Sequence, residues 1–219
     1  MKDNRLLNRF KTEYDFKTFV TSSISLIVTV IFAVYNGFLG IYHASLWHGT
    51  ICVYYLVLVL LRGTIMIAER KASRSTDPEP FRSKVYIFVS ILLLLLNVAL
   101  IVPVALMVRQ LKPVSLTLIP AISMAAYTTF RIVMASIHLK KRKLSSNCLV
   151  RLLRTINFID ALVAILTLQN TLIMVISDER GLSKMLPLTA ITSGAVWLFI
   201  LVLSVLAIRR GVRQIKGLS

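Results

Sequence analysis

The chain alternates between long apolar runs and short polar gaps. Six apolar stretches lie at roughly 17–42, 50–69, 84–108, 115–138, 153–177 and 185–208. Each supplies about 20 residues or more, the length that an α-helix needs to cross a hydrocarbon core about 30 Å thick. The pattern therefore predicts an all-α, polytopic membrane protein with six transmembrane helices, and the short gaps predict antiparallel neighbours.

This division gives the chain three parts. We expect residues 1–16 to form a cytoplasmic or interfacial N-terminal segment, residues 17–208 the six-helix transmembrane domain, and residues 209–219 a basic cytoplasmic tail. The N-terminal segment has apolar residues at helical spacing with basic residues between them, which is typical of an interfacial amphipathic helix. A disordered tail is the alternative. The gap that contains Pro78 and Pro80 is predicted to be a loop.

Composition supports a membrane location independently. Hydrophobic residues make up 57% of the chain and charged residues only 16%. Soluble domains use roughly 45–50% apolar residues. A lipid bilayer is therefore the expected surrounding for most of this chain.

The basic residues predict the orientation. Of the 26 Lys and Arg residues, 20 lie in the gaps and ends on one side of the six stretches, four lie on the other side, and two lie inside the stretches. Short loops rich in Lys and Arg stay in the cytoplasm, so both termini should be cytoplasmic. The net charge of +17 is spread over these short loops. It therefore favours attraction to anionic lipid headgroups over binding of nucleic acid.

An internal repeat is suggested by the positions of charged residues. A shift of 69 residues places Arg62 on Arg131, and a shift of 72 places Asn97 on Gln169. One interpretation is three tandem helical hairpins, formed by helices one and two, three and four, and five and six. Chance alignment of apolar sequence is the other interpretation.

Three charged side chains lie well inside the apolar stretches: Arg62, Arg131 and Asp160. Each costs about 2.5–3.5 kcal/mol at the middle of a transmembrane helix, so each is expected to have a partner. At a rise of 1.5 Å per residue, all three lie about 10–12 Å from the cytoplasmic ends of their helices. The shared depth makes direct pairing possible if their helices are neighbours, with Asp160 accepting a bidentate bond from one arginine.

Polar side chains on the same helices and on the third helix extend this cluster to a candidate substrate-binding site. The predicted set is Arg62, Arg131, Asp160, Asn97, Asn157 and Tyr127. Two guanidiniums and one carboxylate leave a charge of +1, which a bound anion, a lipid phosphate or water would have to compensate. The alternative is that these residues only hold the helices together through hydrogen bonds.

The chain lacks the spacings of common catalytic and metal-binding signatures. The chain contains no HExxH, GxSxG, GxGxxG, CxxC or phosphate-binding glycine loop, so enzymatic activity and a cofactor are not expected. His43 and His48 lack a third ligand nearby, so no metal site is expected. Cys52 and Cys148 are predicted at opposite ends of the bundle and cannot form a disulfide.

The first two helices carry a loose sequence pattern, made up of Tyr35-Asn36-Gly37, Leu39-Gly40, Ser45-Leu46-Trp47, Tyr54-Tyr55-Leu56 and Arg62. This pattern resembles small, uncharacterised multi-pass membrane proteins from Gram-positive anaerobic bacteria. It covers some 30 residues. The resemblance implies a bacterial plasma membrane location and gives no residue a role.

Two functions remain as hypotheses. The first is a small transporter or channel-like protein that binds an anionic or zwitterionic solute near the buried charges. The second is a structural or regulatory membrane subunit, in which the same charges hold the helices together or await a membrane protein partner or a second copy. An intramembrane enzyme comes third, without a motif in its favour.

Overall fold

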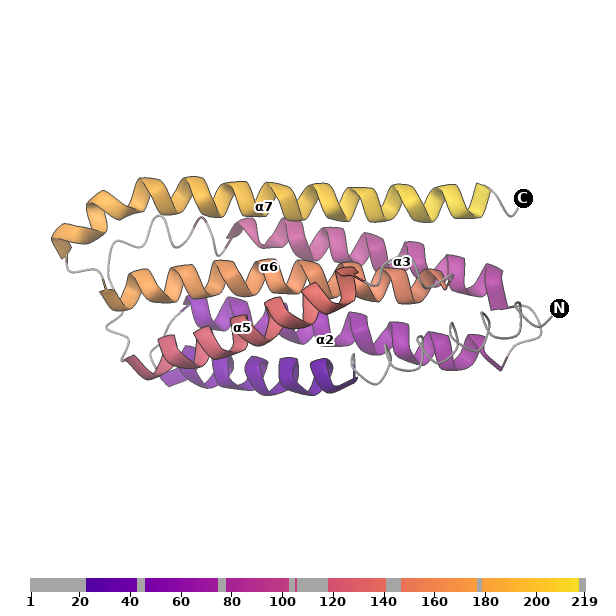
Figure 1. The fold of residues 1–219 in the computed structure, drawn as a ribbon, viewed down its shortest axis with the longest axis horizontal. Coiled ribbons are helices and arrows are strands. Elements are labelled where there is room, and N and C mark those ends of the chain that lie inside the picture. Colours follow the sequence, from indigo (N-terminus) through magenta and orange to yellow (C-terminus); the bar gives the residue numbers. More distant parts are fainter. Residues whose placement is uncertain are drawn as a thin grey trace.

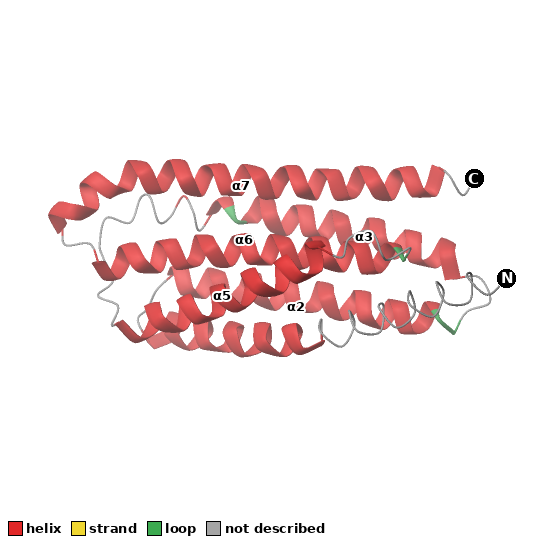
Figure 2. Ribbon diagram, in the orientation of Figure 1, coloured by secondary structure: helices red, strands yellow, loops and turns green. Residues whose placement is uncertain are grey.

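The computed structural model describes residues 23–42, 46–74, 78–102, 105, 118–140, 147–176 and 179–216. These residues form six helices and no strand (Figures 1 and 2). The first helix is Ser23–Tyr42, and the five that follow are α2 (Leu46–Ala72), α3 (Pro78–Ala99), α5 (Leu118–Lys140), α6 (Cys148–Ile176) and α7 (Glu179–Lys216). The predicted all-α fold is confirmed. The predicted N-terminal segment lies outside the described residues.

Four of the helices are long and apolar enough to cross a bilayer: Ser23–Tyr42, His48–Ala72, Pro78–Ala99 and Ala190–Arg213. A shorter apolar helix, Ile122–Ile137, lies within α5. Large apolar side chains on these helices stay more than half exposed, among them Ile31, Leu60, Phe88 and Val202. Such a surface suits lipid and not water. The chain is therefore a multi-pass helical membrane protein.

Helix α6 lies at the centre of the bundle. It packs against α2, α3, α5 and α7, and Figure 1 shows it running lengthwise among them. Seven apolar side chains along its first half are no more than 1% exposed: Leu149, Val150, Leu152, Leu153, Ile156, Ile159 and Val163. Only one narrow face, which includes Arg151, is exposed or partly buried, so the helix mainly contacts protein. Polar and charged residues of α6 can therefore be paired inside the bundle.

The order of packing corrects the expectation of three tandem hairpins. The first helix contacts α2, and α6 contacts α7, as two of the three hairpins require. Helix α3, however, packs on α2 and α7, whereas α5 packs mainly on α6. The middle hairpin is therefore wrong. Helix α3 ends at Ala99, before the predicted boundary at 108, although Ile101, Val102 and Ala105 beyond it are also helical.

Two helix boundaries also differ from the pattern. Helix α3 begins at Pro78, so Pro78 and Pro80 lie in its first turn instead of in a loop. Proline is tolerated there because the first backbone N–H groups of a helix have no partner within the helix. Helix α7 continues to Lys216 through most of the predicted basic tail.

A polar cluster joins three helices at the end of the bundle that carries the basic gaps. Glu69 of α2 accepts two hydrogen bonds from Arg82 of α3, at 2.5 and 3.0 Å. The amide of Asn147 donates to Glu69 at 2.8 Å, and its oxygen accepts from the N–H of Leu149 at 3.0 Å. Asn147 is thus the N-cap of α6. These contacts set the relative height of α2, α3 and α6.

Close helix contacts occur at two glycines. A Cβ atom on Gly40 would lie 2.9 Å from the backbone nitrogen of Gly49, where the first helix meets α2. A Cβ atom on Gly211 would lie 2.6 Å from the ring of Tyr86, where α7 meets α3. Only glycine permits these approaches without displacement of a neighbour.

Candidate functional site

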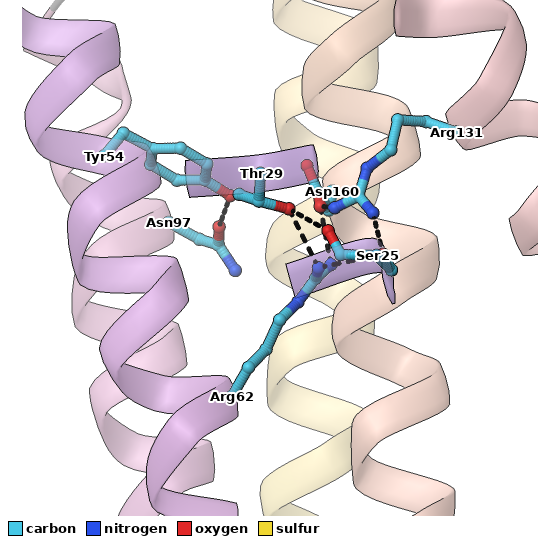
Figure 3. A network of polar contacts seen from close by, with 7 residues as sticks. All are labelled: Ser25, Thr29, Tyr54, Arg62, Asn97, Arg131 and Asp160. Atoms are coloured by element: carbon cyan, nitrogen blue, oxygen red, sulfur yellow. Dashed lines mark hydrogen bonds and ion pairs between the residues drawn. The ribbon is translucent and has the colours of Figure 1, made fainter. Parts of the chain in front are cut away.

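Asp160 on the central helix is held between two arginines. Its Oδ2 atom accepts a hydrogen bond from Nη2 of Arg62 at 2.5 Å and forms an ion pair with Nη2 of Arg131. Figure 3 shows the two arginine side chains approaching Asp160 from opposite sides. The prediction that these three charges meet is confirmed, and both arginines take part. We refer to Arg62, Arg131 and Asp160 as the charge triad.

Two hydroxyl groups of the first helix complete the surroundings of the arginines. Ser25 Oγ accepts hydrogen bonds from Nη1 of Arg62 at 3.2 Å and from Nη1 of Arg131. Thr29 Oγ1 accepts from Nη1 of Arg62 at 3.1 Å and donates to the carbonyl of Ser25 at 2.8 Å. Residues four apart lie on one face of a helix, so both hydroxyls can face the triad. The site therefore joins four helices.

The triad is shielded from solvent. The exposed fractions are 1% for Arg62, 2% for Arg131 and 0% for Asp160. Guanidiniums stay protonated in proteins, so two positive charges face one carboxylate, and Ser25 and Thr29 add none. The triad therefore carries a net charge of +1 in a medium where charge is costly to bury.

Part of the hydrogen-bonding capacity of the triad is unused. Within the described residues, Asp160 Oδ1 and the Nε atoms of Arg62 and Arg131 have no hydrogen-bond partner. Buried groups of this kind are usually paired, with water or a ligand if not with protein. The triad therefore has donor and acceptor atoms left for further hydrogen bonds.

Aromatic rings lie beside the triad, on the side away from the basic ends of the helices. Phe32 stacks on Tyr127 with ring centroids 3.7 Å apart, and Tyr55 meets both rings edge-on at 5.1 and 5.9 Å. The guanidinium of Arg131 lies 5.5 Å from the centroid of the Tyr127 ring. Such a cation–π contact helps to keep the arginine charged and in place. Tyr127 is thus next to the triad, as the sequence predicted.

The other two predicted site residues do not contact the triad. Asn97 belongs to a separate cluster, in which its side chain accepts from Tyr54 at 3.3 Å and donates to Ser204 at 2.8 Å. Its carbonyl accepts from Trp197 at 3.0 Å. Asn97 thereby links α2, α3 and α7 and has a structural role.

Asn157 lies on α6 one turn before Asp160. It is 4% exposed, and its side-chain amide has no hydrogen-bond partner among the described residues. The structure therefore buries this residue near the triad without connecting it to the three charges. Its assignment to the site remains a prediction.

Sequence reasoning missed Ser25, Thr29 and Phe32. A usable signal was present, because Ser25 and Thr29 are four residues apart in an apolar run and therefore share a helix face. The same depth argument that joined the three charges places Ser25 and Thr29 at a similar depth in the first helix. Hydroxyl groups were left out because they carry no charge.

No family model, curated protein or solved structure matches this chain. The function therefore has to be argued from the site itself.

The described residues contain no group of three His, Cys, Asp or Glu side chains that could hold a metal ion. His43 lies outside those residues, and His48 is buried. Cys52 is partly buried, Cys148 is buried, and both thiols are free.

The arrangement at the charge triad is suited to electrostatic binding.

Proposed function

We propose that this protein binds a small anionic or zwitterionic solute at Arg62 and Arg131 and carries it across a bacterial plasma membrane. The observation that supports this proposal is the excess of one buried positive charge, presented by two guanidiniums that point at the same pair of oxygen atoms. Ionisable groups inside a membrane are costly and usually mark the path of a substrate or ion.

The arginine donors supply recognition. A guanidinium offers parallel N–H groups that match the two oxygens of a carboxylate or oxyanion. In the structure, Nη2 of both arginines faces Asp160 and Nη1 of both faces Ser25. A solute anion that displaces one of these acceptors would take over its contacts with both arginines. Capture then requires no covalent step.

The orientation of the site in the membrane is inferred from the Lys and Arg residues in the gaps between the apolar stretches. With both termini in the cytoplasm, Arg62 lies about 10 Å, at 1.5 Å per residue, beyond the cluster around Glu69 at the cytoplasmic end. The rings of Phe32, Tyr55 and Tyr127 then lie on the outer side of the triad. The site is thus nearer to the cytoplasm than to the outside.

The orientation is tested by a single thiol at the C-terminus. We expect Ser219→Cys, made in a chain whose Cys52 and Cys148 are replaced by serine, to react with a membrane-impermeant maleimide only after the cells are opened. Labelling of intact cells would place the C-terminus outside and contradict the proposed orientation.

Transport is tested in proteoliposomes by efflux of nitrate, acetate and sulfate and by uptake of glycine. At least one of these probes should cross faster than in empty liposomes, and Arg62→Gln and Arg131→Gln should each abolish the difference. Arg82→Gln is the matched control, because Arg82 is also paired with a carboxylate but lies outside the triad. Equal loss of transport in the control, or none in the triad variants, would contradict the proposal.

A second function has one observation in its favour. Asp160 Oδ2 and Ser25 Oγ each contact both arginines already, so the triad ties four helices together without a ligand. A non-catalytic structural or regulatory membrane subunit would use it in that way. In that case Arg131→Gln would lower the thermal stability of the purified protein, and no anion would raise that of the unmodified chain.

A further inference from the structure

We infer that the triad selects singly charged anions and that Asp160 sets this preference. The inference rests on the proposed function, because it concerns the ligand of the same site. Its basis is the charge of each side chain that meets there and the identity of the two acceptors that the arginines share. Together these fix how much negative charge the site can bury.

The two acceptor positions are not equivalent. On the Nη2 side the arginines share Asp160 Oδ2, a charged acceptor that is 0% exposed. On the Nη1 side they share Ser25 Oγ, a neutral hydroxyl, with Thr29 as a second neutral acceptor for Arg62. A charged acceptor adds a Coulomb attraction to the guanidinium that a neutral hydroxyl lacks. An incoming anion therefore gains most by replacing the hydroxyls, while Asp160 stays in place.

Counting charges then gives the valence of the ligand. Arg62, Arg131 and Asp160 sum to +1, so a singly charged anion makes the site neutral. A doubly charged anion would leave −1, and a zwitterion would leave +1, in a site that is 0–2% exposed. Uncompensated charge in such a place is strongly unfavourable. Nitrate and small carboxylates satisfy this rule, whereas sulfate and glycine do not.

Asp160 is therefore a specificity-determining residue. Replacing it by asparagine keeps its shape and one carbonyl acceptor but raises the charge of the empty site to +2. Sulfate, and no longer nitrate, then restores neutrality. Replacing Arg131 by glutamine in the same chain returns the charge to +1. The preference for nitrate or sulfate should therefore change with the net charge of the empty site.

The test is the thermal stability of the purified protein in nanodiscs, titrated with nitrate and with sulfate at pH 7 and constant ionic strength. The unmodified chain should bind nitrate at least about tenfold more tightly than sulfate, since burying one uncompensated charge costs more than the 1.4 kcal/mol that a tenfold ratio represents. Asp160→Asn should prefer sulfate, and the double variant Asp160→Asn/Arg131→Gln should prefer nitrate again.

The possible outcomes separate this inference from the proposed function. If the unmodified chain binds both anions with equal strength, or favours sulfate, the charge count is wrong although anion binding stands. If no anion stabilises it, the binding site itself is refuted. Should Asp160→Asn fail to fold, the unmodified chain and the double variant still decide the matter. A double variant that prefers sulfate would overturn the inference.

Discussion

Removing Asp160 and removing Arg131 should affect stability very differently. Both variants break the pair of Arg131 and Asp160, and Asp160→Asn also breaks the pair of Arg62 and Asp160. Asp160→Asn leaves two guanidiniums facing each other, whereas Arg131→Met leaves the pair of Arg62 and Asp160, which is neutral and joined at 2.5 Å. A count of ion pairs alone would predict only a twofold difference between the losses.

The expected losses in the free energy of unfolding follow from the geometry of the triad. Both arginines contact one oxygen atom of Asp160, so their nearest nitrogen atoms lie within about 5 Å of each other. At an effective dielectric constant near 20, two like charges at that separation repel by about 3 kcal/mol. Leaving an uncompensated buried charge typically costs about 3–5 kcal/mol. We therefore expect Asp160→Asn to lower the free energy of unfolding by about 3–5 kcal/mol and Arg131→Met by no more than about 1 kcal/mol.

The assay is unfolding of the purified variants in mixed micelles with increasing denaturing detergent, followed by circular dichroism. Low salt without added oxyanions prevents a bound anion from replacing the lost carboxylate. A loss for Arg131→Met that equals or exceeds the loss for Asp160→Asn would refute the charge count. It would also show that Arg131 contributes mainly by packing on Tyr127.

Two further predictions concern packing and a buried thiol. Gly211→Ala should destabilise the protein by about 1–3 kcal/mol because its new methyl group would lie 2.6 Å from the Tyr86 ring. Gly194→Ala is the control, since nothing lies within 4 Å of its new methyl group, and detergent unfolding should show no loss for it. A smaller loss for Gly211→Ala than for the control would contradict the close contact. Cys148, at the first residue of α6, is buried, which raises the pKa of its thiol to about 11. In a Cys52→Ser chain, the rate of maleimide labelling measured by mass spectrometry should therefore stay low from pH 7 to pH 9, because the thiolate forms only near pH 11. A rate that rises to that of a free cysteine by pH 9 would contradict this assignment.

The charge triad was predictable because two simple constraints act on it. A charged side chain in an apolar helix must find a partner, and a fixed rise per residue converts sequence position into depth. Arg62, Arg131 and Asp160 meet both constraints, so their contact could be expected without knowledge of the packing. The same reasoning predicted Tyr127, which precedes Arg131 by one helical turn.

The position of Asn97 shows where that reasoning ends. Depth along a helix can be read from sequence, but rotation about the helix axis and the choice of neighbours depend on how all six helices pack. Asn97 faces α2 and α7 instead of the triad, since α3 lies between those two helices. The placement of α3 away from α5 was missed for the same reason, and so was the central position of α6.

The central position of α6 constrains how the chain can be assembled. During synthesis from the N-terminus, Ser25, Arg62 and Arg131 enter the membrane before Asp160 has been made. Until α6 arrives, the growing chain holds two guanidiniums without their carboxylate. The early helices therefore cannot complete their association, and a chain truncated before residue 160 would be a substrate for membrane quality control. The insertion of α6 thus lowers the buried charge of the triad from +2 to +1, and only α7 follows it along the chain.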